Sequence, residues 1–268
     1  MRTLKLPDRI IIFALTLALV LMTGCSAMSV HRAMSHSSLT RELNEFQPGI
    51  LEGYLSRDQL PNSLVILPQP PAEGSAEWSL DMELAKEYLD MEDEERKELA
   101  RADAELHFPE ATEAFNRVLN LDITEENTPL VYLILRRSLT DAALSTYQAK
   151  NQYKRPRPFM VNGGPTCTPD VEEYLREDGS YPSGHTAIGW TWALILAELF
   201  PEQADIIMVR GQEFGISRNI CNVHWHSDVI AGRTMGASVV ARLHANEDVR
   251  MDMIAARAEI QKIRKKEQ

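Results

Sequence analysis

The segment Thr186–Phe200 (TAIGWTWALILAELF) constrains the fold most, because it is apolar on nearly every side. A helix with apolar residues all round is buried in a protein core or spans a membrane. Its 15 residues are short for a bilayer span, and Pro201 ends the run at once. We therefore predict that this segment is the central, buried helix of a soluble helical bundle.

Helical spacing also occurs elsewhere in the chain. Ser75 is a candidate N-cap for a helix in which Leu80, Leu84 and Tyr88 recur at helical intervals. Further helices are expected over residues 111–120, 130–147 and 228–243, with a charged one from residue 247. Alternating strand patterns are scarce, and 268 residues suit one domain. We predict an all-α, single-domain helical bundle.

The domain is expected to occupy residues 61–268, behind a less regular beginning. Residues 25–60 show no sustained period and are interpreted as a poorly specified lead-in. Residues 61–75 become rich in proline, which predicts an extended segment along the domain surface.

Residues 1–24 have the pattern of an export signal. Three basic residues precede an apolar stretch of 13 residues, Ile10–Met22, which is short for a bilayer span. An uncleaved N-terminal anchor is the competing interpretation. Two cut sites also compete, because LMTGC before Ser26 resembles a bacterial lipobox that would lipidate Cys25, whereas an ordinary cut could follow Ala27. We favour lipidation and predict a periplasmic protein that a lipid would anchor to the outer membrane.

Export changes the charge that the mature protein carries. Loss of residues 1–24 leaves 25 basic and 38 acidic residues, a net charge of −13. General nucleic-acid binding needs clustered Lys and Arg, so no nucleic-acid polymer is expected as a partner. Basic residues that gather at one place in such an acidic chain indicate a local purpose.

Export also bears on the cysteines. With Cys25 lipidated or removed, Cys167 and Cys221 remain, and an oxidising compartment favours a disulfide between them. Two unrelated buried thiols are the alternative. The bridge would tie the loop after Pro158 to the turn after Arg218.

The stretch Gly179–Thr186 (GSYPSGHT) stands directly before the predicted central helix. A helix N-terminus presents unpaired N–H groups and a partial positive charge, which suit an anion. Gly184 lets the backbone approach that anion, and Ser183 can add a hydroxyl donor. His185 then stands where it could protonate a leaving oxygen. An ordinary Ser cap beside an incidental His is the competing interpretation.

Cations lie upstream in the pattern Lys150-x6-Arg157. The guanidinium fork of Arg157 suits phosphate oxygens, and Lys150 supplies a compact charge. A solvated basic patch is the competing interpretation. Arg155, like Arg157, is followed by a proline, but the position that should hold its lysine is Gln148. We therefore assign Arg157 to the site and place Arg155 and Lys154 at the surface.

The third cluster reads Ser217-Arg218-x5-His224-x3-Asp228. His224 and Asp228 are four residues apart and would share one face of a helix. A carboxylate behind one ring nitrogen fixes the tautomer and makes the other nitrogen a better nucleophile. Taken alone, the pair is a weak signal, because helical His–Asp pairs are often structural. No role is given to His107, His226 or His244.

The three clusters together are far more specific than any one of them. Their order and spacing resemble the signature of the type 2 phosphatidic acid phosphatase superfamily, which includes the bacterial class A non-specific acid phosphatases and the vanadium haloperoxidases. All eight signature positions match, and GSYPSGHT further resembles the class A acid phosphatase signature. The likeness covers roughly residues 61–262.

The resemblance implies a role for each matching residue. His224 would be the nucleophile that takes the phosphoryl group, His185 the general acid, and Asp228 the group that orients His224. Five residues would hold the phosphate oxygens, namely Lys150, Arg157, Ser183, Gly184 and Arg218. Because Lys and Arg supply the positive charge, neither a metal nor another cofactor is expected.

These observations predict an exported acid phosphatase that hydrolyses small phosphomonoesters, nucleotides among them, through a phosphohistidine. Transfer of the phosphoryl group to an alcohol is a second outcome. The alternatives are a vanadate-dependent haloperoxidase, an integral-membrane lipid phosphatase and a non-enzymatic lipoprotein that keeps the fold. The expected partners are small phosphomonoesters, a membrane reached through the lipid anchor, and further copies of the chain in a homodimer or higher homo-oligomer.

Overall fold

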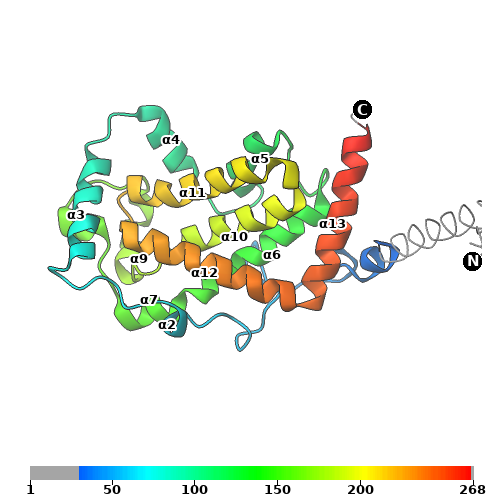
Figure 1. Cartoon of the computed structure of the whole chain (residues 1–268), viewed down its shortest axis with the longest axis horizontal. Helices are drawn as coiled ribbons and strands as arrows, with labels where there is room; N and C mark the ends of the chain where they lie inside the picture. Colours follow the sequence, from blue (N-terminus) through cyan, green and yellow to red (C-terminus); the bar gives the residue numbers. More distant parts are fainter. Residues whose placement is uncertain (1–29, 267–268) are drawn as a thin grey trace, which may run out of the picture.

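The computed structural model describes residues 30–266, so the predicted signal segment and Cys25 lie outside the described residues. Helices make up nearly all of the regular structure (Figure 1). Among the described residues, the only strands are β1 (Glu45–Gln47) and β2 (Ile50–Leu51), which pair antiparallel as a hairpin. The predicted all-α fold is confirmed.

The helices follow one another with short connections. In chain order, the α-helices are α2 (Ser63–Ile66), α3 (Ala76–Leu89), α4 (Glu94–Ala102), α5 (Glu113–Leu119), α6 (Pro129–Ser145), α7 (Tyr147–Tyr153), α8 (Pro158–Asn162), α9 (Glu172–Glu177), α10 (Gly184–Leu199), α11 (Ala204–Ile220), α12 (His226–Ala245) and α13 (Glu247–Lys266). The 3₁₀ helices are η1 (Ser38–Thr40), η2 (Glu110–Thr112), η3 (Pro169–Val171) and η4 (Pro201–Gln203).

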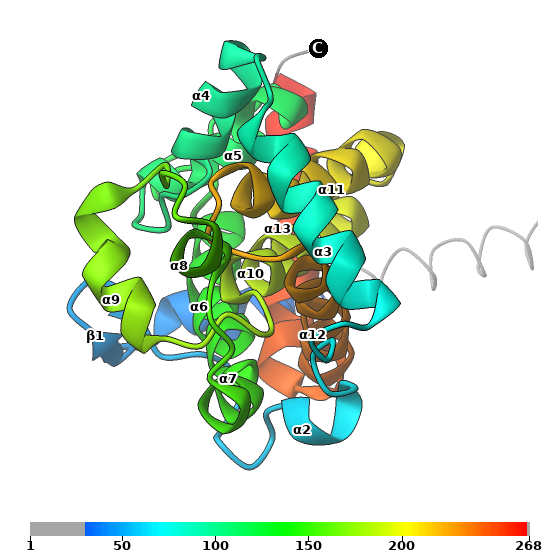
Figure 2. The same ribbon diagram turned by 90° about the vertical axis from the view of Figure 1, so that its left-hand side faces the viewer.

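Helix α10 is the central helix, as its apolar sequence predicts. It packs mainly against α6, α11 and α12, and Figure 2 shows it in the middle of these helices, seen from one end. Close packing at its N-terminus depends on Gly232 of α12, where a Cβ would lie 2.6 Å from the carbonyl oxygen of Ser183. Helices α10 and α12 therefore approach closely beside Ser183, where α10 begins.

The N-terminal residues are more ordered than expected. Tyr54 donates its hydroxyl to Asp252 at 2.8 Å and its backbone N–H to Asp141 at 2.9 Å. Both carboxylates are buried, and buried carboxylates require such donors. The segment described as a poorly specified lead-in therefore packs against the helical domain. Its contacts come from single side chains and backbone groups, which leave no periodic pattern in the sequence.

Two predictions concern the segment that precedes α4, and one of them is confirmed while the other is wrong in part. Ser75 caps α3 as predicted, since its hydroxyl oxygen accepts the N–H of Trp78 at 3.1 Å. Residues 61–75 were expected to be extended, but Ser63–Ile66 forms the short helix α2. Asn62 caps this helix by accepting the N–H of Leu64 at 3.0 Å, and the prolines become dense only after Leu67.

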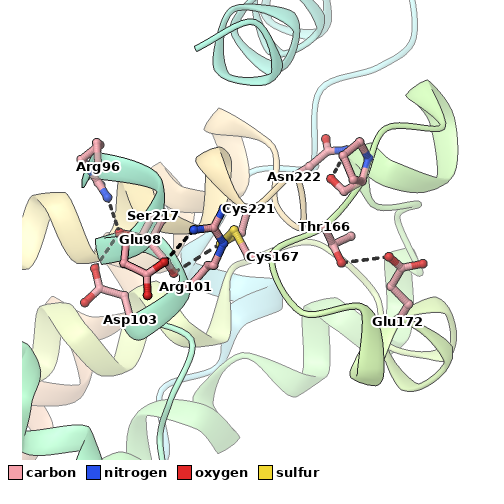
Figure 3. Close-up of a disulfide and its surroundings, with 12 residues drawn as sticks. Arg96, Glu98, Arg101, Asp103, Thr166, Cys167, Glu172, Ser217, Cys221 and Asn222 are labelled. Atoms are coloured by element: carbon pink, nitrogen blue, oxygen red, sulfur yellow. Dashed lines mark hydrogen bonds and ion pairs between the residues drawn. A yellow bond between two sulfur atoms is a disulfide. The ribbon is translucent and has the colours of Figure 1, made fainter. Parts of the chain in front are cut away.

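The predicted disulfide between Cys167 and Cys221 is present (Figure 3). It joins the loop before η3 to the C-terminal end of α11, with the two Cα atoms 4.7 Å apart.

Each helix in residues 30–266 is too short or too polar to span a lipid bilayer.

Candidate active site

The three sequence clusters meet at one pocket of about 390 Å³ beside the N-terminus of α10. The cluster residues that line it are Lys150, Arg157, Gly184, His185, Arg218 and His224. Ser183 and Asp228 do not line the pocket but lie buried behind it. The structure thus brings together residues that are far apart in the sequence, and it separates those facing the pocket from those supporting them.

The pocket carries more positive charge than its protein partners neutralise. Arg218 is 3 % exposed, and its Nε and Nη1 have no hydrogen-bond partner among the described residues. Burial and the charge of Arg157 lower the pKa of Arg218 to about 10, and the same two causes lower the pKa of Lys150 to about 8. Buried cations whose charged forms are disfavoured make a binding site for an anion.

Asp178 is a site residue that the sequence reasoning missed. Its Oδ2 accepts hydrogen bonds from Lys150 Nζ and from Arg157 Nη2, each at 2.8 Å. This single carboxylate fixes the two cations relative to each other. Among the three cations of the pocket, Arg218 is the one without an acidic partner at hydrogen-bond distance in the described structure. The sequence feature that could have revealed Asp178 is its place directly before Gly179–Thr186. It was overlooked because an acidic residue was not expected inside an anion site.

His224 presents one ring nitrogen to the cations and the other to a carboxylate. Its Nε2 lies 3.0 Å from Arg157 Nη1, and because a guanidinium only donates, Nε2 is the unprotonated nitrogen. Its Nδ1 faces Asp228 Oδ2 at 3.5 Å and Ser180 Oγ at 3.4 Å. Burial, followed by the charges of Arg157 and Lys150, lowers the pKa of His224 well below its ordinary value. The imidazole is therefore neutral, with its lone pair on the pocket side.

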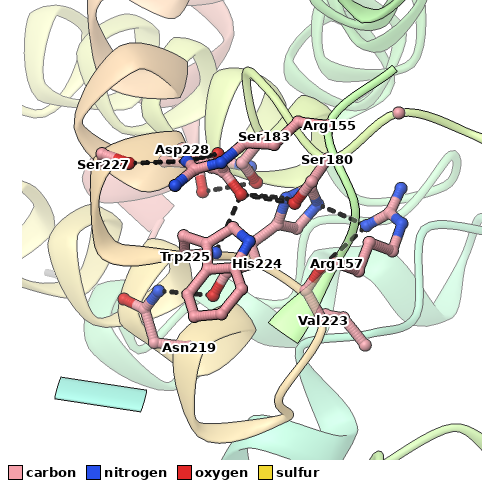
Figure 4. Close-up of polar contacts among 12 residues, drawn as sticks. Arg155, Arg157, Ser180, Ser183, Asn219, Val223, His224, Trp225, Ser227 and Asp228 are labelled. Carbon is pink, nitrogen blue, oxygen red and sulfur yellow. Dashed lines mark hydrogen bonds and ion pairs between the residues drawn. The ribbon is translucent and has the colours of Figure 1, made fainter. Parts of the chain in front are cut away.

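His224 and Asp228 lie close together, but they do not share one face of a helix, as was predicted. That prediction was wrong because His224 precedes α12 and only Asp228 lies within it. Asp228 instead sits in the first turn, where its Oδ2 accepts the backbone N–H of Trp225 at 2.8 Å and a hydrogen bond from the hydroxyl of Ser180 (Figure 4). The carboxylate thus caps the helix and faces the histidine at the same time.

His185 lies across the pocket at the start of α10. Its Nε2 is 3.1 Å from the carbonyl oxygen of Ala104. A carbonyl only accepts, so Nε2 carries a proton and Nδ1 is the nitrogen that can gain and lose one. Burial and the charge of Arg218 lower the pKa of His185 well below its ordinary value. Its acidic form is therefore confined to low pH.

The placement of Arg155 at the surface was wrong. Its side chain is 9 % exposed, and its Nη1 lies 2.6 Å from Asp228 Oδ1. Lys154 is exposed, as predicted. The prediction depended on whether a lysine stands seven positions before the arginine. The partners of Arg155 are instead two acidic residues, Asp81 of α3 and Asp228 of α12.

The serine of the third cluster has a structural partner. Ser217 donates to Asp103 Oδ2 at 2.6 Å and accepts from Arg96 Nη1 at 3.0 Å (Figure 3). Asp103 also pairs with Arg210 of α11. This buried network fastens the end of α4 to the turn of α11 that carries Arg218.

The rest of the pocket wall is largely apolar. Hairpin β1–β2 contributes Phe46 and Ile50, and helices α6 and α7 contribute side chains that include Leu139 and Tyr147. His107 also lines this part of the wall, whereas His226 and His244 do not. Within residues 30–266, no three His, Cys, Asp or Glu side chains gather as a metal ion would require.

A neutral imidazole, a protonatable imidazole and three buried cations around one pocket are the kinds of group that phosphoryl transfer requires. The family model described as PAP2 superfamily matches residues 128–251. A non-specific acid phosphatase of Providencia stuartii is 40 % identical over 79 % of this chain and 86 % of its own length.

Further comparisons agree with that relative. An acid phosphatase of Zymomonas mobilis is 34 % identical over 97 % of this chain and 93 % of its own, and a non-specific acid phosphatase of Salmonella typhimurium is 36 % identical over 78 % and 84 %. A bacterial vanadium-dependent iodoperoxidase structure has a TM-score of 0.46 at 17 % identity, covering 77 % of this chain and 63 % of that one, a likeness too weak to bear on the reaction. The chain belongs to the class A non-specific acid phosphatases of the PAP2 superfamily, and it is an acid phosphatase.

Proposed function

We propose that this phosphatase hydrolyses small phosphomonoesters through a phosphohistidine on Nε2 of His224. The observation that carries the proposal is the direction of that ring, with Nε2 toward Arg157 at 3.0 Å and Nδ1 toward Asp228. A phosphate oxygen can accept the N–H of Arg157 and so free the Nε2 lone pair. Asp228 then balances the charge that the ring acquires.

The reaction divides into two displacements. The Nε2 lone pair of His224 attacks phosphorus, the bond to the leaving oxygen breaks, and that oxygen takes the proton from Nδ1 of His185. A water molecule then attacks the phosphohistidine while Nδ1 of His185 takes its proton, and the N–P bond breaks to release phosphate. An alcohol in place of water gives phosphotransfer.

Stabilisation of the transition state falls to the cations and to the start of α10. Lys150, Arg157 and Arg218 neutralise the equatorial oxygens, and the backbone N–H groups at Gly184 point along the helix axis. Ser183 accepts hydrogen bonds from Thr186 N at 3.2 Å and Oγ1 at 2.9 Å, so from behind the pocket it holds the first turn of α10, whose N–H groups meet the phosphate.

Leaving groups with apolar surface suit the remaining wall. Phe46, Tyr147 and Tyr174 line the pocket together with aliphatic side chains, and aromatic rings can pack against a nucleobase or an aryl group. Nucleotides and aryl phosphates are therefore the proposed substrates. The haloperoxidase alternative has no specific observation in its favour, and its test is halide oxidation with added vanadate and peroxide.

The first test is an assay of the mature chain against a panel of phosphomonoesters across pH. We expect hydrolysis at acid pH that persists in EDTA and is inhibited by vanadate, which matches the shape and charge of the transferring phosphoryl group. Hydrolysis that EDTA removes and a divalent metal restores would contradict the proposed mechanism.

We propose that the protein is exported and lipidated at Cys25, on the strength of the apolar stretch and the LMTGC sequence before Ser26. The expected result is a mature chain that begins at Cys25 and carries a lipid mass, measured by mass spectrometry of membrane-extracted protein. A soluble mature chain that begins after Ala27 would contradict lipidation but support export. The homo-oligomeric state stays a prediction.

A further inference from the structure

We propose that Arg155, held by Asp81, is a positioning residue that sets the orientation of Asp228 and, through it, of His224. The inference rests on the proposed role of His224 as the nucleophile. It concerns a cation outside the eight signature positions and a carboxylate outside residues 128–251, where the family model matches.

One carboxylate oxygen of Asp228, Oδ1, is bound by Arg155 alone among the described residues. Asp228 Oδ2 is held by Trp225 N and Ser180 Oγ and faces His224, whereas Oδ1 contacts only Arg155 Nη1 in the described structure. A carboxylate held through one oxygen can rotate about that contact. The bond from Arg155 therefore fixes which oxygen faces the imidazole (Figure 4).

Asp81 holds Arg155 in turn. It lies on α3, is 1 % exposed, and its Oδ2 accepts from Arg155 Nη2 at 2.7 Å. The same carboxylate accepts the N–H of Ser227 at 2.8 Å and its hydroxyl at 2.6 Å, and thereby binds the first turn of α12. Arg155 thus bridges two buried carboxylates, one from a distant helix and one beside the nucleophile.

The geometry favours positioning over substrate binding. Neither Arg155 nor Asp81 lines the pocket in which the phosphate would bind. The guanidinium lies 5.4 Å from the centre of the Trp225 ring and donates to Ser227 Oγ at 2.7 Å, contacts that restrict its plane. A planar fork fixed at both ends transmits orientation better than a flexible ammonium would.

The variants Arg155→Met, Arg155→Lys and Asp81→Asn test this, alone and in an Arg155→Met/Asp81→Asn pair. Lys154→Met is the matched control, because it removes an adjacent but exposed cation. For each variant, kcat, KM and the inhibition constant of inorganic phosphate are measured on the mature enzyme, with circular dichroism and thermal melting to confirm folding. His224→Ala is assayed beside them.

We expect Arg155→Met to lower kcat about 10–100-fold, the range typical when an outer partner of a functional ligand is lost. KM and inhibition by inorganic phosphate should stay within about threefold, because the phosphate-facing cations keep their contacts. Arg155→Lys, which also covers the case of a poorly folded Met variant, should have an intermediate kcat. Asp81→Asn should lower kcat in the wild-type background but add little to Arg155→Met, since it acts through that residue.

Two results would overturn the inference. One is a folded Arg155→Met or Arg155→Lys variant with the kcat of wild type. The other is a parallel loss of kcat and of affinity for inorganic phosphate, which would mean that Arg155 supports the pocket as a whole. The failure of the phosphohistidine proposal is separate, because it would appear as turnover by His224→Ala regardless of the Arg155 results.

Discussion

His224→Ala is expected to lower kcat by at least about 10⁴-fold, because it removes the atom that forms the bond to phosphorus. The fold should persist, since the ring is neutral and its loss leaves no unpaired charge in the core. The measurement is the steady-state rate with an aryl phosphate, together with acid- and base-quenched trapping of the labelled enzyme. Wild type should yield an acid-labile, base-stable phosphoenzyme, and the variant none.

His226→Ala is the matched control for that experiment. His226 lies two residues further on, at the start of α12, and does not line the pocket. It should retain turnover within about threefold, as expected of a residue without contact to the reacting atoms. A His224→Ala enzyme that kept its rate, or still formed the labelled intermediate, would remove His224 from the role of nucleophile.

His185→Ala is expected to have an effect that depends on the leaving group. With an alkyl phosphate, whose alkoxide is a poor leaving group, kcat should fall about 10²–10⁴-fold, the usual contribution of a general acid. With p-nitrophenyl phosphate the fall should be far smaller, because the phenolate leaves without a proton. Rates on the two substrates with the same protein provide an internal control for folding.

The pH dependence should change in the same variant. Burial and Arg218 lower the pKa of His185, so its acidic form is present only below a pKa that lies under the ordinary value of about 6.5. Rate therefore falls as pH rises through that pKa, which gives an acid optimum. In His185→Ala this alkaline limb should flatten for the alkyl phosphate, whose turnover by wild type depends on the acid. Ionisation of the substrate is common to both enzymes, and an unchanged limb would assign the acid to another group.

Local sequence patterns predicted the parts of the molecule that depend on local physics. The central helix followed from apolar residues on every side of residues 186–200, and the cap of α3 followed from Ser75. The resemblance to a family signature identified the residues around the pocket, because local physics alone does not show that three separate clusters meet.

What local patterns missed depends on contacts between distant segments. The partners of Arg155 come from α3 and α12, and no spacing rule links residue 81 to residue 155. The His224–Asp228 pair was placed on a helix because four-residue spacing suggests one, but Trp225 begins the cap between them. Asp178 was missed because an acidic side chain inside an anion site has meaning only when its two cationic partners are seen together.

The buried, unpartnered guanidinium of Arg218 also has a consequence for stability. A desolvated charge without a counterion opposes folding, and an apolar side chain of similar size would suit that place in α11 better. The free energy of unfolding and turnover therefore place opposite demands on residue 218, because the charge that would hold the phosphate costs stability while the pocket is empty.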